Sequence, residues 1–498
     1  MFADLLLAQE NYGMKRFAII GGGISGLAAA HHLLELSGAQ RRSIDLDIFE
    51  AGARLGGTVQ TEERDGFLIE RGPDSFISEK PQAVELAHRL ALDRHLIETN
   101  EEHRRSFIVR KNRLRPVPEG FQLLAPSRVW PFVTTDIFSL TGKLRMAADL
   151  VIPREKTNGN TDESLAHFVR RRLGQEALER MAQPMVGGIY TADPERLSLR
   201  ATLPRFLDME QEHRSIILAM RHRGKSAGPS PSTSGVSGAR YSLFLSFDRG
   251  MQVLTDELQR RLIHGNYEYA NVNLRLNTRV QSLERVVSED GQTWKLVTGE
   301  GQTTNADAVC LAIPSYSAAS LLHNIHPQLS RKLREIQFAS TATVNLAYRR
   351  SDIQHHLDGF GFVVPFIEKR AIIACTFSSV KFANRAPEGF VLLRAFVGGA
   401  LQPEMFSLDH SDMIALVKAD LQELLGVRGN SLFEVVTKWD NSMPQYEVGH
   451  LDRVAAIEES IAEVSGLTLA GNSYFGAGIP DCIGSGERAA RSLFDSQH

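Results

Sequence analysis

The sequence predicts a mixed α/β fold in which a nucleotide-binding domain is interleaved with a β-sheet domain and a helical insertion. Three observations predict it. An apolar run of strand length opens onto a glycine cluster at Gly21, Gly23 and Gly26, a second glycine-rich loop precedes a helix near the C-terminus, and strand-like runs over 274–314 lead back to the first domain. A glycine turn between strand and helix is typical of a Rossmann-like dinucleotide site, because the helix N-terminus presents unpaired N–H groups to phosphate.

Each glycine of the first cluster has its own expected role. Gly21 allows the tight turn, Gly23 lets a pyrophosphate approach the backbone, and Gly26 lets the helix pack closely on the strand. A lone glycine fingerprint is a weak signal, so an acidic residue after the next strand is needed to support it. Glu50 ends the alternating run 44–50 and is a candidate ligand of the ribose hydroxyls. The alternative is a buried α/β turn followed by a surface glutamate.

Length, charge and cysteine content limit the class of protein. A chain of 498 residues is expected to form two or three domains and to bury large ligands. The formal net charge of −3 argues against nucleic acid as the main partner. Cys310, Cys375 and Cys482 are far apart in the sequence, which suggests neither a zinc site nor a disulfide framework. We therefore expect a cytoplasmic protein without a metal site.

The sequence predicts no membrane-spanning helix, because no uncharged apolar run of about 18 residues occurs outside the glycine motif. Residues 1–13 carry Asp4 and Glu10 and lack a basic start, so they are a poor secretion signal. The translation start is left open between Met1 and Met14. A peripheral contact with the inner face of the membrane is also left open.

The first elements after Glu50 continue the nucleotide domain. A glycine-rich loop over 51–57 carries Arg54, which is expected to reach the pyrophosphate; an ordinary solvated arginine is the alternative. Asp65 and Gly66 then predict a hairpin turn between two short strands.

The middle of the chain is predicted to be mainly helical. Pro81 is expected to open a helix, and the basic stretch 104–115 alternates like a half-buried strand. A solvated outer face is the favoured explanation of its arginines, and a substrate with several carboxylates is the alternative. Prolines interrupt a helical spacing over 116–210, which predicts a packed helical insertion. Within it, the paired glycines of 183–194 predict a loop, either beside a ligand or as a simple helix-to-helix turn.

The second half of the chain returns to strands. A mobile surface loop is expected at 225–238 because it is rich in Ser, Gly and Pro, and a strand meander follows over 274–314. Aromatic strand-like runs fill 338–400; core packing explains most of them, and a flat hydrophobic substrate face is the alternative. A capped helix is predicted over 411–426. The stretch 467–490 is again strand, glycine-rich loop and helix, which predicts a second helix N-terminus suited to an anion.

A glycine loop at each end of the chain, with a meander that rejoins the nucleotide domain, resembles the superfamily of FAD-dependent amine oxidases and desaturases. The resemblance runs from about Lys15 to the C-terminus. Within the superfamily, five stretches are similar to the oxygen-dependent protoporphyrinogen and coproporphyrinogen oxidase family. They are 70–76, 184–194, 359–361, 396–399 and 471–483.

The resemblance implies the domain organisation and the FAD contacts. The FAD-binding domain would comprise 14–85, 240–312 and 440–498, the substrate-binding domain 86–110 and 313–439, and the helical insertion 111–210. The implied FAD contacts lie in the two glycine loops, after the second strand, in the turn at 71–74 and in the meander. They are Gly21, Gly22, Gly23, Ile24, Ser25, Gly26, Glu50, Ala51, Arg54, Arg71, Gly72, Pro73, Asp74, Val280, Ala477, Gly478 and Ile479.

The resemblance also implies a hydrophobic substrate slot. Its lining would be Gly187, Gly188, Phe360, Val363, Thr376 and Phe396. Val363 and Thr376 stand where the plant-type enzymes are expected to carry leucines. Those enzymes hold a propionate of the substrate with an arginine. The position of that arginine aligns between Asp93 and Arg94 of this chain, so Arg94 is one candidate for the propionate-binding residue and Lys80 is another.

The implied activity is the six-electron oxidation of a porphyrinogen to the porphyrin in haem biosynthesis, with O2 as acceptor and H2O2 as product. The flavin carries the redox chemistry, so no catalytic side chain or metal is required. An amine oxidase or carotenoid-type desaturase of the same superfamily is the first alternative, and a flavin-binding regulatory protein without catalysis is the second. The choice between coproporphyrinogen III and protoporphyrinogen IX is left open, as is the choice between monomer and homodimer.

Overall fold

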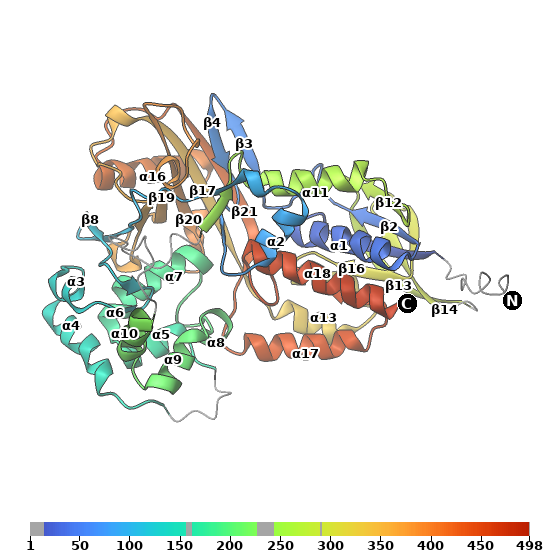
Figure 1. The fold of residues 1–498 in the computed structure, drawn as a ribbon, viewed down its shortest axis with the longest axis horizontal. Coiled ribbons are helices and arrows are strands. Elements are labelled where there is room, and N and C mark those ends of the chain that lie inside the picture. The colour runs from blue at the N-terminus through green and yellow to red at the C-terminus, as the bar shows by residue number, and fades with distance from the viewer. Residues whose placement is uncertain (1–13, 156–161, 227–243, 289–290, 498) are drawn as a thin grey trace.

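The computed structural model describes residues 14–155, 162–226, 244–288 and 291–497. These residues form two sheet domains and a helical part (Figure 1). The first sheet is parallel and has five strands in the order β12-β2-β1-β16-β22. The strands are β1 (Lys15–Ile20), β2 (Ile44–Phe49), β12 (Ala270–Arg275), β16 (Ala308–Leu311) and β22 (Leu467–Leu469). Because β16 pairs with β1, the apolar run predicted to return to the nucleotide domain does so.

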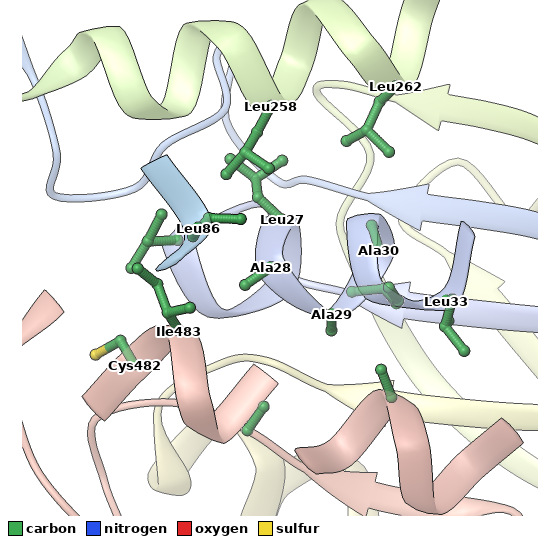
Figure 2. Packing of buried hydrophobic residues seen from close by; sticks show 14 of the residues in the cluster. Leu27, Ala28, Ala29, Ala30, Leu33, Leu86, Leu258, Leu262, Cys482 and Ile483 are labelled. Atoms are coloured by element: carbon green, nitrogen blue, oxygen red, sulfur yellow. The ribbon is translucent and has the colours of Figure 1, made fainter. Parts of the chain in front are cut away.

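Both faces of this sheet are covered, as its nearly continuous apolar strands require. On β1, Phe17 and Ile19 face one hydrophobic cluster, while Ala18 and Ile20 face the other. Figure 2 shows α1 in the first cluster, between α11 and α18. The helices of that cluster are α1 (Ile24–Gln40), α2 (Gln82–Arg89), α11 (Gln252–His264) and α18 (Ile479–Ser496). The second cluster comes from β13 (Val280–Ser288), β14 (Gly291–Thr298), β15 (Thr303–Ala306), α12 (Ser315–Leu322), α13 (Pro327–Arg334) and α17 (His450–Ala462).

The second sheet has seven strands in the order β21-β17-β20-β19-β18-β7-β8. Its pairs are antiparallel except β7 with β18. One face packs against α16 (His410–Leu425) through a hydrophobic cluster. The strands are β7 (Phe107–Arg110), β8 (Arg113–Pro116), β17 (Phe338–Arg349), β18 (Gly361–Val363), β19 (Ile372–Phe377), β20 (Phe390–Gly398) and β21 (Phe433–Pro444).

The helical part packs around its own hydrophobic cluster at one end of the molecule (Figure 1). It comprises α3 (Val129–Thr134), α4 (Leu140–Ala147), α5 (Leu165–Arg172), α6 (Gln175–Ala177), α7 (Gln183–Tyr190), α8 (Leu199–Thr202), α9 (Arg205–His213) and α10 (Ile216–Ser226). Within the described residues, none of the helices combines the length and the apolar character that a membrane crossing needs.

Most of the predicted elements are confirmed. The mixed α/β fold, with a Rossmann-like domain, an interleaved sheet and helices inserted between them, is the observed one. Asp65 and Gly66 have positive φ angles of 50 and 79° and join β3 (Thr61–Arg64) to β4 (Phe67–Glu70) as a hairpin. The predicted capped helix is α16, whose N-cap is Asp409 and whose C-cap is Gly426 in the left-handed conformation.

Two predictions of local structure were wrong. The stretch 183–194 is mostly the helix α7, which contains both paired glycines and ends at Thr191 in the left-handed conformation. Proline in the first turn is compatible with a helix, so the prolines and glycines of this stretch are not a loop signal. Short strands at 121–122 and 125–126 occupy the start of the predicted helical insertion, and its helices continue to Ser226. The predicted mobile loop lies outside the described residues apart from its first two positions.

Candidate functional site

The glycine loop between β1 and α1 is closed on one side and open on the other. A Cβ atom added at Gly26 would lie 1.9 Å from the carbonyl oxygen of Gly21, and one added at Gly21 would lie 2.4 Å from that of Ala312. A Cβ atom added at Gly23 would meet no protein atom within 4 Å. The open space at Gly23 lies at the N-terminus of α1, so it fits a phosphate-bearing group. The closed and open positions agree with the roles predicted for the three glycines.

Glu50 follows β2 and lies beside this loop. Its Oε2 accepts a hydrogen bond of 2.8 Å from the Gly22 amide, and its Oε1 accepts one of 2.6 Å from the Gly52 amide. The carboxylate is therefore held at the edge of the sheet where a ribose is expected. The guanidinium of Arg54 donates to carbonyl oxygens of its own loop, including that of Val59 at 2.7 Å. In this structure Arg54 braces the loop.

Other predicted FAD contacts surround the same edge of the sheet. Val280 begins β13 and packs in the cluster that contains Phe49. Ile24 and Ser25 form the first turn of α1, and both are buried. Ala51 is exposed beside Glu50.

A second helix N-terminus points in the same direction. α18 begins at Ile479, with Gly478 as its N-cap and Ala477 before it. Gly486 of α18 packs directly on α1, because a Cβ atom there would lie 2.1 Å from the carbonyl oxygen of Ser25. In Figure 1 the N-terminal ends of α1 and α18 both point towards the second sheet. The two glycine loops are thus brought together, as a ligand shared between them requires.

The turn at 70–74 connects this region to the seven-stranded sheet. The carbonyl oxygen of Arg71 accepts a hydrogen bond of 3.0 Å from Trp439 Nε1, and the carbonyl oxygen of Gly72 accepts one from Arg394 Nη2. The donors come from the edge strand β21 and from β20, two strands away, so the turn lies over this end of the sheet on the face that α16 does not cover.

A half-buried and a buried carboxylate, Asp74 and Glu70, belong to this turn. Asp74 Oδ2 lies 2.9 Å from Lys381 Nζ. Burial alone would raise the pKa of Asp74, but the charges of Lys381 and Arg394 hold it well below its usual value. Glu70 accepts a hydrogen bond of 2.8 Å from the Met251 amide, and burial raises the pKa of Glu70 to about 7.

Three predicted substrate residues share the face that the turn crosses. Val363 on β18 is paired with Ala374 on β19, and Ala374 is paired with Phe396 on β20, so the three form one row across the sheet. Thr376 is two residues along β19 from Ala374 and points to the same side. Helix α7 covers this row, since a Cβ atom at Gly188 would lie 3.6 Å from Val363 Cγ1. We refer to this face as the site face.

The two predicted propionate cations lie elsewhere. Lys80 Nζ lies 2.6 Å from Asp481 Oδ1 in the first turn of α18, so Lys80 stands at the helix N-terminus and not on the site face. Arg94 is exposed, and its Nε donates to His95. It precedes β6 (Leu96–Glu98), which belongs to a small sheet with β5 (Phe76–Ile77) and β11 (Phe244–Phe247) in the order β5-β11-β6. The structure does not bring Arg94 beside the other predicted substrate residues.

The remaining predicted lining residues are buried or helical. Phe360 is 3% exposed immediately before β18, and Gly187 precedes Gly188 in α7. A cavity of about 410 Å³ opens on another side, between 192–197 and the start of β17. It includes none of the predicted substrate residues, so it is not the predicted slot. Within the described residues, His, Cys, Asp and Glu side chains form no group of three or more suited to a metal ion.

Sequence reasoning missed the buried charges of this region. Glu70, Lys381 and Arg394 gather around the turn, although they are more than 300 residues apart at the extremes. The sequence did carry a signal at Arg394, which interrupts the otherwise apolar run 390–398. A charge inside a buried strand has either a structural partner or a functional reason to be there.

Comparisons with known proteins identify the family of the chain. A model of the family described as flavin containing amine oxidoreductase matches residues 24–493. The chain is 36% identical to a coproporphyrinogen III oxidase of Bacillus subtilis (strain 168), over 96% of this chain and 97% of that protein. It is 29% identical to a chloroplastic protoporphyrinogen oxidase of Nicotiana tabacum, over 93% of this chain and 83% of that protein.

Solved structures are also similar. A protein of Exiguobacterium sp. 255-15, provisionally named a protoporphyrinogen oxidase, superposes with a TM-score of 0.82 at 31% identity and covers 97% of this chain and 99% of its own. A putrescine oxidase superposes at 0.63 with 16% identity, covers 97% of this chain and 99% of its own, and shares the fold alone. The chain belongs to the flavin-containing amine oxidoreductases and, within them, to the family of coproporphyrinogen III and protoporphyrinogen oxidases. The predicted FAD cofactor and oxidoreductase class are thereby confirmed.

Proposed function

We propose that this protein oxidises a porphyrinogen to the porphyrin in haem biosynthesis, with FAD as the bound oxidant, O2 as the final acceptor and H2O2 as the product. The observation that carries the proposal is the position of the turn at 70–74. It links the glycine loops, which fit a dinucleotide, to the site face, which bears Val363, Thr376 and Phe396. A dinucleotide and a flat apolar substrate would therefore meet at this turn.

The chain's own residues bind and orient. FAD supplies the two-electron oxidation in each of three rounds. Gly23 and the N-terminus of α1 would hold its phosphates, and Glu50 its ribose. Phe396 and Val363 would form an apolar wall against the macrocycle, and α7, whose Gly188 lies against Val363, would exclude water at that end of the wall. Placing the substrate carbon against the flavin is the main contribution of the protein.

Coproporphyrinogen III is the substrate we favour, because the B. subtilis relative carries that name and protoporphyrinogen oxidases are more distant in sequence. Coproporphyrinogen has four propionates, so cations beside the site would favour it over protoporphyrinogen, which has two. Lys80, 45% exposed at the N-terminus of α18, is a cation that a substrate carboxylate could reach. Arg94 remains the second candidate.

An aerobic assay tests the activity. Purified, FAD-loaded protein is mixed with coproporphyrinogen III and with protoporphyrinogen IX in parallel, and porphyrin fluorescence is followed against an enzyme-free control. We expect fluorescence to rise above the autoxidation control with both, and faster with coproporphyrinogen III. No rise with either substrate, together with oxidation of a primary amine, would instead assign the protein to the amine oxidases.

We also propose a peripheral membrane contact through an apolar patch on α3 and α4. Trp130, Leu140 and Leu144 are 75, 79 and 73% exposed, which is unusual for large apolar side chains close together in the sequence. The cation that this patch offers an anionic lipid surface is Arg128, which is 57% exposed and also pairs with Glu119, because the Lys143 ammonium donates to the Val133 carbonyl oxygen.

Vesicle sedimentation tests the membrane contact. We expect the protein to sediment with vesicles containing phosphatidylglycerol and to do so less with neutral phosphatidylcholine vesicles. The double variant L140D/L144D should remain in the supernatant while it keeps its FAD. If the variant bound vesicles as well as the wild type does, this patch would not be the membrane contact. If the wild type self-associated without vesicles, the patch would be a dimer interface instead.

A further inference from the structure

Arg394 lies in the middle of an apolar strand. On β20, Leu393 and Ala395 point into the core beneath α16, whereas Arg394 and Phe396 point to the site face. Arg394 is paired with Thr376 on one side and Asn345 on the other. It is only 4% exposed, so its charge is removed from water.

The contacts of Arg394 connect the two halves of the site. Its Nη2 donates to the carbonyl oxygen of Gly72 in the turn predicted to contact FAD. Its guanidinium carbon lies 4.7 Å from the centre of the Phe396 ring on the predicted substrate wall. Its Nε is buried and has no hydrogen-bond partner in the structure. A buried N–H group without an acceptor is costly, so the site carries a donor that the protein itself leaves unused.

The charge of Arg394 is also not balanced by a contact. Among the described residues no carboxylate forms an ion pair with it; the carboxylates that act on it from farther away are Asp74, which pairs with Lys381 at 2.9 Å, and Glu70. Arg385, the next cation, donates to the Phe247 carbonyl oxygen at 2.8 Å and to Ser246 at 3.0 Å. Arg394 therefore lies near Asp74 and Glu70 without contacting either carboxylate, and a negative charge that arises nearby on the site face is stabilised by it.

We propose that Arg394 is a positioning residue whose buried charge stabilises FAD in its reduced, anionic form. This inference rests on the proposed function for its cofactor. In one round the substrate loses two electrons and two protons: a hydride passes from a bridge carbon to FAD, the pyrrole N–H bond breaks and its proton goes to water, and FAD gains one negative charge. Oxygen then accepts the two electrons and two protons as H2O2, which removes that charge.

Direct binding of a substrate carboxylate by Arg394 is the competing explanation. The guanidinium is almost fully covered by protein atoms, and the Phe396 ring lies 4.7 Å from it on the predicted substrate wall, so burial does not favour direct contact with a substrate carboxylate. An effect of charge at a distance through the turn is compatible with this burial.

The test uses the FAD-loaded full-length protein and the variants R394M and R394K. Arg349 provides the matched control, because it also stacks on a phenylalanine of this sheet, 5.6 Å from the ring of Phe390, but it is exposed and distant from the turn. The midpoint potential of the bound flavin is measured by equilibration with a redox dye. We expect R394M to lower the ratio of reduced to oxidised flavin at a fixed potential by about tenfold, or about 30 mV for a two-electron couple. R394K and R349M should stay close to the wild type.

Sulfite provides a second readout, since its adduct with flavin is anionic and requires no porphyrinogen. The affinity of R394M for sulfite should fall about tenfold, while that of R394K is preserved. An unchanged potential and unchanged sulfite affinity in R394M would overturn the inference, as would an equal change in R349M. A raised KM for coproporphyrinogen with an unchanged potential would assign Arg394 to the substrate instead. Because neither flavin readout uses a porphyrinogen, failure of the proposed activity would be seen separately.

Discussion

Arg172 in the helical part and Arg394 on the site face are both buried arginines, but their surroundings differ. Arg172 is fully buried, and its Nε donates to Asp149 at 2.7 Å while its other nitrogens reach backbone carbonyl oxygens. Asp149 is in turn satisfied by Ser215 Oγ at 2.6 Å. Arg394 has one backbone acceptor, an unpaired Nε and no carboxylate contact. A buried arginine whose N–H groups all have protein acceptors stabilises one conformation. A buried arginine with an unpaired N–H group leaves a donor and a charge that a ligand can use.

The same division occurs in the glycine loop. Gly26 is closed by the carbonyl oxygen of Gly21, and Gly23 faces open space. The position that packs helix on strand is thus filled by protein atoms, and the position proposed for an FAD phosphate is not. Each of the following predictions compares a closed position with an open one.

Removing Arg172 from its buried ion pair with Asp149 should have the largest effect on stability. R172M leaves Asp149 buried without its cation, so we expect the free energy of unfolding to fall by about 3 to 5 kcal/mol. The flavin potential should not change, in contrast to R394M. Urea denaturation of the FAD-loaded protein measures the loss, and the double variant R172M/D149L should recover part of it. If R172M lowered the free energy of unfolding by less than about 1 kcal/mol, the hydrogen-bond partners of Arg172 and Arg394 would not explain a difference in their roles.

The paired variants G26A and G23A come next. A Cβ at position 26 must push against backbone, so G26A should lower the free energy of unfolding by about 1 to 3 kcal/mol. G23A should leave the stability of the FAD-free protein within about 0.5 kcal/mol. The dissociation constant of FAD should nevertheless rise about tenfold or more in G23A, or about 1.4 kcal/mol. Fluorescence titration with FAD measures this, and wild-type affinity in G23A would place the phosphates elsewhere.

The buried carboxylate Glu70 should make stability depend on pH. Burial raises its pKa from a usual value of 4.5 to about 7, so the folded state binds the proton more tightly than the unfolded state. Its contribution is fully present below pH 4.5 and is lost as the pH rises towards 7. We expect the wild type to lose on the order of 1 to 3 kcal/mol relative to E70Q between pH 4.5 and pH 7. Parallel stability profiles from urea denaturation would contradict this.

Lys80 should give the smallest effect on stability. Its pair with Asp481 is half exposed, and such pairs contribute less than about 1 kcal/mol. K80M should therefore melt close to the wild type, but its KM for coproporphyrinogen III should rise while kcat changes little. K80R provides the control for charge. An unchanged KM in K80M would leave Arg94 as the candidate for the propionate.

Local sequence was sufficient to predict the nucleotide-binding fold. The glycine loops, Glu50 and the returning strand β16 are each specified by a short run of residues, and a strand-to-helix turn depends on few distant contacts. The helix α7 was not predicted, because prolines and paired glycines in isolation are turn signals. The reason for a glycine at position 188 becomes clear only from the packing of α7 against Val363.

The site face could not be assembled from sequence. Its row depends on the register between β18, β19 and β20, and the turn that crosses it comes from residues more than 300 positions earlier than Arg394. Register is set by the packing of whole sheets, so no local pattern reports it. The family resemblance placed Phe396 on the substrate wall but said nothing of the charge beneath it.

The most direct test of the account is an anaerobic, single-turnover mixing of the FAD-loaded protein with coproporphyrinogen III, followed by the visible absorbance of the oxidised flavin. If the turn at 70–74 joins an FAD site to a porphyrinogen site, the flavin absorbance should bleach in a single fast phase, and admission of O2 should restore it. Flavin that stays oxidised under these conditions, and that an amine reduces, would contradict the account.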